Sequence, residues 1–447
     1  MADTTHDLTT GPVWRALARL SAPMVLGILA TLSVGLADAY FLGRLGGAPL
    51  AAVGFIYPVT AAVTSLSIGL SAGANATVSQ AIGDDRNPNR IGLHAVGLGV
   101  ALAVVMAGLI YLIYPWMFRM LGATGATATQ IAAFMPWWCL SFPFLVVTMQ
   151  AMALFRAHGS AVAPSLLMTG AALVNIARDP LLIFTFKYGT AGAAMATFIA
   201  RAIFAVIAVI YALHRGVLVW CADLSRDLWW SLKELARVGA PAAFSNAINP
   251  AGMALVTAAV ATLGDAAVGG FGAATRVQQI ALVPMLALSA GIGPVVGQNW
   301  GADKPQRAAR TLQAAFAFCL AYGLIVGLGL AFGAQTFAGW LTSDTGTAGY
   351  AAAYMRIVGW SLFGYGFVVV ANAAMNARSR AGWSMGLSLG RIFALYLPGA
   401  WLGVALLDFT GITLAAVAAN VVAVGAACIM AWHLSLLHPR SLRRTFT

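Results

Sequence analysis

The sequence predicts an all-α polytopic membrane protein with twelve transmembrane helices. Composition, the spacing of apolar runs and an internal repeat carry this prediction. Of the 447 residues, 61% are hydrophobic and only 9% are charged, which leaves too little polar surface for a water-soluble globule. A helix needs about 20 apolar residues to cross about 30 Å of hydrocarbon. The chain contains twelve runs of this kind.

Short polar connections separate the runs, so each run is expected to form one helix. The start of the chain lacks a basic segment followed by a short apolar core, so no cleavable signal is expected and the first helix itself directs insertion. The runs cover residues 16–41, 49–80, 91–114, 130–155, 161–185, 190–213, 235–261, 267–298, 311–333, 348–375, 384–407 and 411–434.

The net charge of +12 is explained by membrane topology, because the basic residues lie in short connections and no basic block with interleaved aromatics occurs. A nucleic-acid partner is therefore not expected. Cytoplasmic loops are enriched in Lys and Arg, and basic residues gather after even-numbered runs and at both ends of the chain. We expect both termini to be cytoplasmic. The basic residues that decide this include Arg15, Arg19, Arg86, Arg90, Arg156, Arg215, Arg226, Lys304, Arg307, Arg378, Arg440, Arg443 and Arg444.

The chain is also duplicated. Residues 17–85 align with residues 235–303 at a constant offset without a gap, and the matches run from the leucine at the start of each segment to Asp85 and Asp303. Each half holds six runs, an even number, so the halves cross the membrane in the same direction and are parallel repeats.

The repeat predicts two six-helix bundles related by a pseudo-two-fold axis, with a central cleft between them. We expect an N-lobe at residues 1–213 and a C-lobe at residues 235–447. The linker at residues 214–234 places three tryptophans among charges, which predicts an amphipathic segment on the cytoplasmic surface.

Two carboxylates lie inside apolar runs: Asp38 in the first and Asp179 in the fifth. An aspartate at the centre of a membrane helix costs about 2.5–3.5 kcal/mol on insertion scales, so it indicates a function. Asn175 lies one turn before Asp179 on the same helix face, and Thr197 is a small polar group in the sixth run. Counted along the helices, both acids fall in the outer half of the bilayer and could share a pocket.

Two carboxylates, an amide oxygen and a hydroxyl would form an oxygen cage suited to H⁺ or Na⁺. Two nearby carboxylates in a low dielectric cannot both ionise cheaply, so one is expected to take up a proton near physiological pH. The alternative is structural: Asp179 would pair with its neighbour Arg178, and Asp38 with Arg44.

Other chemistries find little support in the sequence. The four cysteines are scattered, and no Cys/His cluster or HExxH motif occurs, so neither a disulfide framework nor a metal centre is expected beyond possible Na⁺ at Asp38 and Asp179. No nucleophile, base and orienting group recur at a supporting spacing, so an enzyme and a cofactor are not expected. A channel is disfavoured because no ring of selectivity residues is evident.

The segments DAYFLGRLG and NIARDPLLIF, together with the duplicated twelve-helix layout, resemble the multidrug and toxic compound extrusion (MATE) transporters, most closely the prokaryotic DinF-like branch. The resemblance covers essentially the whole chain. It implies that Asp38, Asn175, Asp179 and Thr197 form the cation site of the N-lobe. It also implies that Pro23 of the first helix is a conformational hinge.

The resemblance further implies antiport in a bacterial or archaeal cytoplasmic (inner) membrane, with H⁺ or Na⁺ entering as organic cations such as drugs and toxins leave, and hence a role in antibiotic resistance. NorM-like members use acidic residues of the C-lobe, whereas here the seventh and tenth runs contain none. Arg178 beside Asp179 also departs from the motif and would weaken metal binding, which favours H⁺ over Na⁺. We expect a monomer.

The expected substrate is a large amphipathic cation held by apolar and aromatic walls. Candidate wall residues are Tyr40, Phe55, Tyr57, Met149, Met152 and Phe155. The alternative function is a flippase for polyprenyl-linked sugars or another anionic lipid. Its phosphate-binding candidates are Arg178, Arg201, Arg276, Arg356 and Arg391, although arginines near helix ends often only snorkel.

Overall fold

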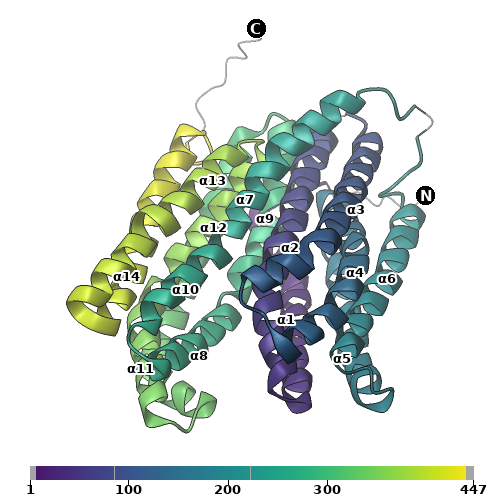
Figure 1. The fold of residues 1–447 in the computed structure, drawn as a ribbon. Coiled ribbons are helices and arrows are strands. Elements are labelled where there is room, and N and C mark those ends of the chain that lie inside the picture. The colour runs from purple at the N-terminus through teal and green to yellow at the C-terminus, as the bar shows by residue number, and fades with distance from the viewer. Residues whose placement is uncertain (1–6, 85, 222, 439–447) are drawn as a thin grey trace. The chain divides into compact units, whose positions relative to one another are not determined.

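The computed structural model describes residues 7–84, 86–221 and 223–438, and these residues form helices without any strand (Figure 1). Internal contacts divide the chain into two compact units. Unit 1 contains Pro23–Ala243, and unit 2 contains Leu8–Ala22 and the chain from Phe244 onward. Some residues used in the sequence argument lie outside the described part of the chain, namely Asp85, Arg440, Arg443 and Arg444.

Unit 1 contains the first six spans and the start of the next helix. Its elements are the part of α1 (Val13–Leu45) from Pro23 onward, α2 (Gly47–Gly83), α3 (Pro88–Met120), α4 (Gly125–Ala157), α5 (Val162–Pro180) with the π-helix η1 (Leu181–Thr185), α6 (Gly189–His214) and the first part of α7 (Leu228–Ala261).

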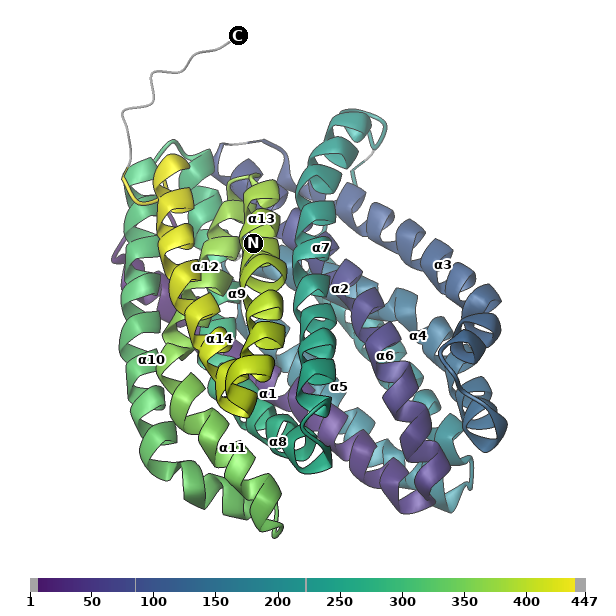
Figure 2. The same cartoon turned by 60° about the vertical axis from the view of Figure 1, so that its left-hand side comes forward.

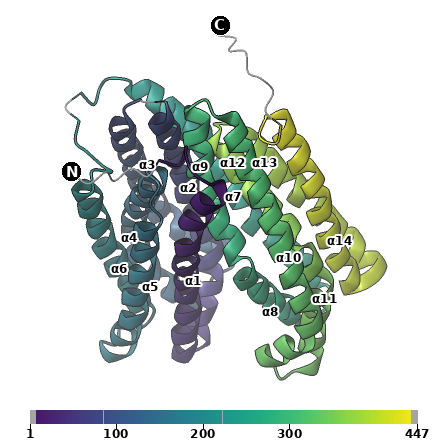
Figure 3. The same cartoon turned by 180° about the vertical axis from the view of Figure 1, so that it is seen from behind.

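Helix α4 forms the core of unit 1. Its sequence is apolar on all sides, and such a helix is expected to be enclosed by others. It packs against α2, α3 and α6, and Figure 3 shows α4, α5 and α6 running alongside one another. Met135, Phe142 and Leu154 of α4 are fully buried. This packing fixes α6, which carries part of the polar site described below.

The start of α7 belongs to unit 1 because it packs on α2. A Cβ atom on Gly73 would lie 2.7 Å from the carbonyl oxygen of Leu235, so only glycine permits this approach. Leu235 is buried in one cluster with Ala74, Ala95 and Ala153. The contact boundary at Ala243 therefore differs from the lobe boundary predicted from the repeat, which starts the second half at residue 235.

The segment before α7 is held on the start of α3. Arg90 forms an ion pair with Asp227 at 2.6 Å, and the His94 ring contacts the carbonyl oxygen of Leu224 at 2.8 Å. Trp220 and Trp229 are 76% and 78% exposed. The linker thus combines polar anchoring to unit 1 with outward-facing tryptophans.

Unit 2 contains the remaining helices. Its elements are the start of α1 up to Ala22, the part of α7 from Phe244 onward, α8 (Asp265–Ala281), α9 (Val283–Gly301), α10 (Pro305–Leu341), α11 (Thr345–Val358), the 3₁₀ turn η2 (Gly359–Ser361), α12 (Leu362–Ala377), α13 (Ala381–Leu389), the π-helix η3 (Gly390–Tyr396) and α14 (Leu397–His433). Helix α12 contacts α9, α10, α13 and α14, and Figure 2 shows α12, α13 and α14 side by side.

The described helices account for the predicted spans once two breaks are considered, one between α8 and α9 and one inside α14. Ten helical segments are long and apolar enough to cross a membrane, and α8 with α9, bent by 45° at Leu282, makes an eleventh. Helix α14 is itself a hairpin, because Leu407 and Asp408 leave helical geometry and Asp408 has φ 52°. A Cβ atom on Gly403 would lie 2.6 Å from the Gly411 backbone, so the two arms fold back on each other. The predicted twelve-helix fold class is confirmed.

Candidate functional site

The polar site of unit 1 is built by α1, α5 and α6. Asp38 lies near the end of α1, Asn175 and Asp179 lie one turn apart on α5, and Thr197 lies on α6. Asp179 is fully buried and Asn175 is 3% exposed. The structure therefore brings together the four residues predicted to form the cation site.

Small residues let these helices approach closely. A Cβ atom on Gly27 of α1 would lie 3.2 Å from Ser165 and Met168 of α5. A Cβ atom on Gly192 of α6 would lie 2.7 Å from the backbone of Leu182 in η1. Helix α5 is thus held between α1 and α6, and its α-helical part ends directly after Asp179 in a π-helix, a distortion common at functional sites.

The carboxyl groups of Asp38 and Asp179 lie side by side and interact directly. The Asn175 Nδ2 atom donates to Thr197 Oγ1 at 3.1 Å, which leaves the Asn175 carbonyl oxygen free. Both oxygens of Asp179 and one of Asp38 are buried and accept from no donor among the described residues. Because two carboxylates cannot donate to each other, a single proton held between them would supply the missing hydrogen bond.

Arg201 is the cation that acts on this pair. It lies one turn after Thr197 on α6 and interacts electrostatically with Asp38. Its Nη1 atom donates to the Ser141 hydroxyl on α4 at 2.7 Å. The site then holds two carboxyl groups and one guanidinium, so one added proton makes it neutral. An added monovalent metal cation would also balance the charge, and the charge of Arg201 opposes a proton and a metal cation alike.

The structure does not contain the ion pairs that the structural alternative required. Ion pairs within the described residues join Arg86 to Asp84, Arg90 to Asp227 and Arg237 to Glu234. Neither Arg178 with Asp179 nor Arg44 with Asp38 is among them, and the Arg44 guanidinium instead lies over the Phe184 ring at 5.8 Å. The nearby positive charge is therefore Arg201, which the sequence had indicated only as a phosphate-binding candidate.

Pro23 lies inside α1, where it removes one backbone donor and favours a bend. Its carbonyl oxygen accepts a hydrogen bond from the Ser165 hydroxyl of α5. The boundary between the two units within α1 falls between Ala22 and Pro23. The predicted hinge residue therefore stands where α1 passes from one set of contacts to the other.

The predicted wall residues occupy different environments. Tyr40 and Tyr57 are 61% and 66% exposed, whereas Met152 and Phe155 are buried in a core cluster of unit 1 that Met149 borders. Phe55 packs against another core cluster of the same unit. In this conformation the tyrosines are open to their surroundings, while Met152 and Phe155 pack the interior.

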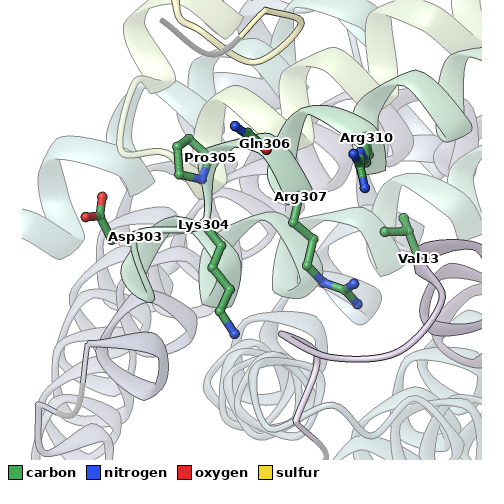
Figure 4. Close-up of a pocket in the computed structure, with 7 residues that line it drawn as sticks. All are labelled: Val13, Asp303, Lys304, Pro305, Gln306, Arg307 and Arg310. Carbon is green, nitrogen blue, oxygen red and sulfur yellow. The ribbon is translucent and has the colours of Figure 1, made fainter. Parts of the chain in front are cut away.

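A basic recess of about 500 Å³ lies at the start of α10 in unit 2. Figure 4 shows Lys304, Arg307 and Arg310 among its lining residues, with Asp303 at one side. Arg307 donates to the backbone carbonyls of Leu8, Thr10 and Gly11. Arg307, which lines this recess, therefore anchors the chain's own segment before α1 within unit 2.

The arginines considered for phosphate binding also separate by environment. Arg276 and Arg356 are exposed and Arg178 is partly buried. Arg391 is the most deeply buried of the five, at 8% exposed. Sequence reasoning had given all five equal weight, because burial of a long side chain cannot be read from its position in a run.

The chain is similar in sequence to known membrane transporters. The chain is 32% identical to the FAD transporter of Shewanella oneidensis, covering 95% of both chains. It is 22% identical to the multidrug export protein MepA of Staphylococcus saprophyticus, covering 94% of both chains.

Among solved structures, the Vibrio cholerae MATE transporter VcmN in its bent form is similar with a TM-score of 0.90 and 28% identity. The match covers 95% of this chain and 97% of that one. A MOP superfamily transporter from Pyrococcus furiosus, at 23% identity, shares the fold with a TM-score of 0.88, covering 98% and 99%.

A family model described as MatE matches residues 23–181 and 241–402. These two matched segments correspond to the two halves of the internal repeat. The chain is therefore a membrane protein of the MATE transporter family.

Proposed function

We propose that this protein exports small organic molecules in exchange for protons, with Asp38 and Asp179 as the proton site. The observation that carries the proposal is the carboxyl pair: three of its four oxygens are buried without a hydrogen-bond donor among the described residues, and Asp38 interacts electrostatically with Arg201. The multidrug export relatives support an organic, drug-like substrate. Large amphipathic cations are the substrate class that a carboxylate site would attract.

The proposed mechanism is alternating access. A proton taken up by the pair removes one negative charge, which weakens the hold on a cationic substrate and allows α1 to rearrange about Pro23. The position of Pro23 at the unit boundary supports this role. Exchange of one proton for one monovalent cation moves no net charge, so the pH gradient supplies the energy: about 1.4 kcal/mol for each pH unit, enough for a roughly tenfold concentration gradient.

The test is ethidium efflux from energised vesicles with a pH gradient or a Na⁺ gradient imposed separately. We expect wild-type efflux to follow the pH gradient, and Asp38→Asn and Asp179→Asn each to abolish it at equal protein levels. Asp265→Asn is the matched control, because Asp265 is exposed at the start of α8 outside the site. Efflux by both site variants at the wild-type rate would refute the mechanism, and dependence on Na⁺ alone would change the coupling ion.

A second candidate is export of phosphate-bearing molecules, which includes the anionic lipids of the alternative above. Two observations favour it: the FAD transporter relative at 32% identity and the buried Arg391 in unit 2. FAD carries two phosphates and an aromatic ring system. Efflux of FAD and of ethidium from the same vesicles would separate the two candidates.

A further inference from the structure

Unit 2 contains a buried cation in a polar cluster formed by Arg391, Asn249, Asn420, Tyr365 and Tyr396, which we call the Arg391 cluster. The guanidinium donates from Nη1 to Asn420 Oδ1 at 2.9 Å and from Nη2 to Asn249 Oδ1 at 2.7 Å. It lies over the Tyr365 ring at 5.0 Å. All of these partners are neutral.

No carboxylate in the described part of unit 2 forms an ion pair with Arg391. The aspartates of this unit lie at helix ends and turns: Asp265, Asp303, Asp344 and Asp408. A buried charge without a counter-charge is costly. The positive charge of Arg391 is therefore solvated by amide oxygens and a ring face but is not neutralised by the unit itself.

Two buried donors in the cluster remain free. Neither Arg391 Nε nor the Tyr396 hydroxyl has a hydrogen-bond partner among the described residues, and Tyr396 is 4% exposed. Asn249 and Tyr365 are only partly buried, so the cluster reaches the surface of the unit on their side. Unused donors next to an uncompensated cation form a site for an anion.

The placement of this cluster corresponds to that of the carboxyl pair in unit 1. Asp38, Asp179 and Thr197 come from the first, fifth and sixth spans of the first half. Asn249, Arg391 and Asn420 come from the first, fifth and sixth spans of the second half, counting the two arms of α14 separately. The fifth span contains a π-helix in both halves, η1 directly after Asp179 and η3 around Arg391. Corresponding spans of the two halves thus carry side chains of opposite charge, although the individual positions do not align.

We propose that the Arg391 cluster binds a phosphate group of the transported substrate. This inference rests on the second candidate function, export of phosphate-bearing molecules, and names the residues that would hold the phosphate. A phosphate offers several acceptor oxygens for the free Nε and hydroxyl donors, and guanidinium groups match its geometry. The Tyr365 ring beside the guanidinium offers a face for an aromatic part of the same molecule.

The test compares FMN with riboflavin, which differ only by the phosphate, in equilibrium dialysis against purified protein in phosphatidylcholine nanodiscs. Wild type should bind FMN about 10- to 100-fold more tightly than riboflavin, as expected for charge-assisted hydrogen bonds. Arg391→Gln should bring this ratio close to one. Arg356→Gln is the matched control, because this exposed arginine of α11 lies outside the cluster.

Tyr396→Phe keeps the proposal testable if Arg391→Gln does not fold. It removes a hydroxyl that has no partner among the described residues, so folding should be preserved. FMN affinity should fall about 3- to 10-fold while riboflavin binding is unchanged. If added phosphatidylglycerol competes with FMN, the phosphate that binds in the membrane belongs to a lipid headgroup. If it does not compete, the phosphate belongs to a soluble molecule.

Equal binding of FMN and riboflavin by wild type, or a preference for FMN that survives in both Arg391→Gln and Tyr396→Phe, would overturn the proposal. If neither flavin binds, inorganic phosphate should still raise the melting temperature of wild type above that in chloride at equal ionic strength. No such increase would also overturn it. Because these measurements use no gradient, they are independent of whether the Asp38 site drives transport.

Discussion

Replacing Arg201 with Gln should shift the pH dependence of transport to higher pH. Arg201 is the guanidinium that interacts with Asp38, and the Ser141 hydroxyl holds it at 2.7 Å. Two unit charges about 5 Å apart at an effective dielectric of about 20 interact by about 3 kcal/mol. Since 1.36 kcal/mol corresponds to one pH unit, and other charges and water reduce the effect, we expect a shift of about 1–2 units.

The sign follows from the charges. Arg201 stabilises the ionised carboxyl pair, so its removal makes the pair hold a proton at higher pH. Proton release on the alkaline side becomes slower, and efflux at neutral pH should fall. The assay is pH-gradient-driven ethidium efflux from proteoliposomes, measured as a function of internal pH. Arg201→Lys retains the charge and should shift the profile much less.

Ser141→Ala tests the same role of Arg201 with a smaller perturbation. It removes the hydrogen bond that positions Arg201 while leaving the charge in place, so its shift should be smaller and in the same direction. An unchanged profile in Arg201→Gln, or a shift to lower pH, would refute the role given to this arginine.

Three further predictions concern stability. Gly192→Ala should lower the melting temperature by several degrees, because its Cβ would lie 2.7 Å from the backbone of Leu182 and overpacking costs about 1–3 kcal/mol. The Thr347 hydroxyl and backbone N–H hold the pKa of Asp344 below its usual value. Wild type should therefore lose part of its stability as the pH falls below about 4 and Asp344 becomes protonated. Asp344→Ala should be less stable at neutral pH and should lack this loss of stability in acid. Arg307→Ala removes four hydrogen bonds to three carbonyls of the segment before α1 and should speed limited proteolysis there without changing FMN binding.

Most of the fold follows from the sequence because the bilayer leaves few alternatives. Runs of sufficient length must be helices, and the gap between the last two runs marks the turn of α14 at Asp408. The break between α8 and α9 was not predicted, although Pro284 directly follows Val283 and disfavours a continuous helix there. The 3₁₀ turn at Gly359–Ser361 has no comparable signal in the sequence. The two π-helices do adjoin prolines, Pro180 directly before η1 and Pro398 just after η3, but these residues do not show which distortion forms.

The carboxyl site was partly predictable because helical spacing sets which residues share a face. Asn175 and Asp179 are four residues apart, and so are Thr197 and Arg201. What spacing does not provide is the rotation of α5 and α6 about their axes. The close packing at Gly27 and Gly192 sets that rotation. In the resulting arrangement Arg201 is the counter-charge of the acidic pair, whereas the sequence had indicated it as a phosphate ligand.

The Arg391 cluster shows why a buried arginine site is harder to predict from sequence than a buried carboxyl site. The sequence presents Arg276, Arg356 and Arg391 as similar residues in or near spans. An arginine has a long stem, so its charged head can reach polar surroundings some distance from its Cα. Only the position of the head distinguishes the exposed Arg276 and Arg356 from Arg391, which is held by Asn249 and Asn420. An intramembrane carboxylate has a short side chain that stays close to its backbone, so the acidic site could be inferred from sequence and the basic one could not.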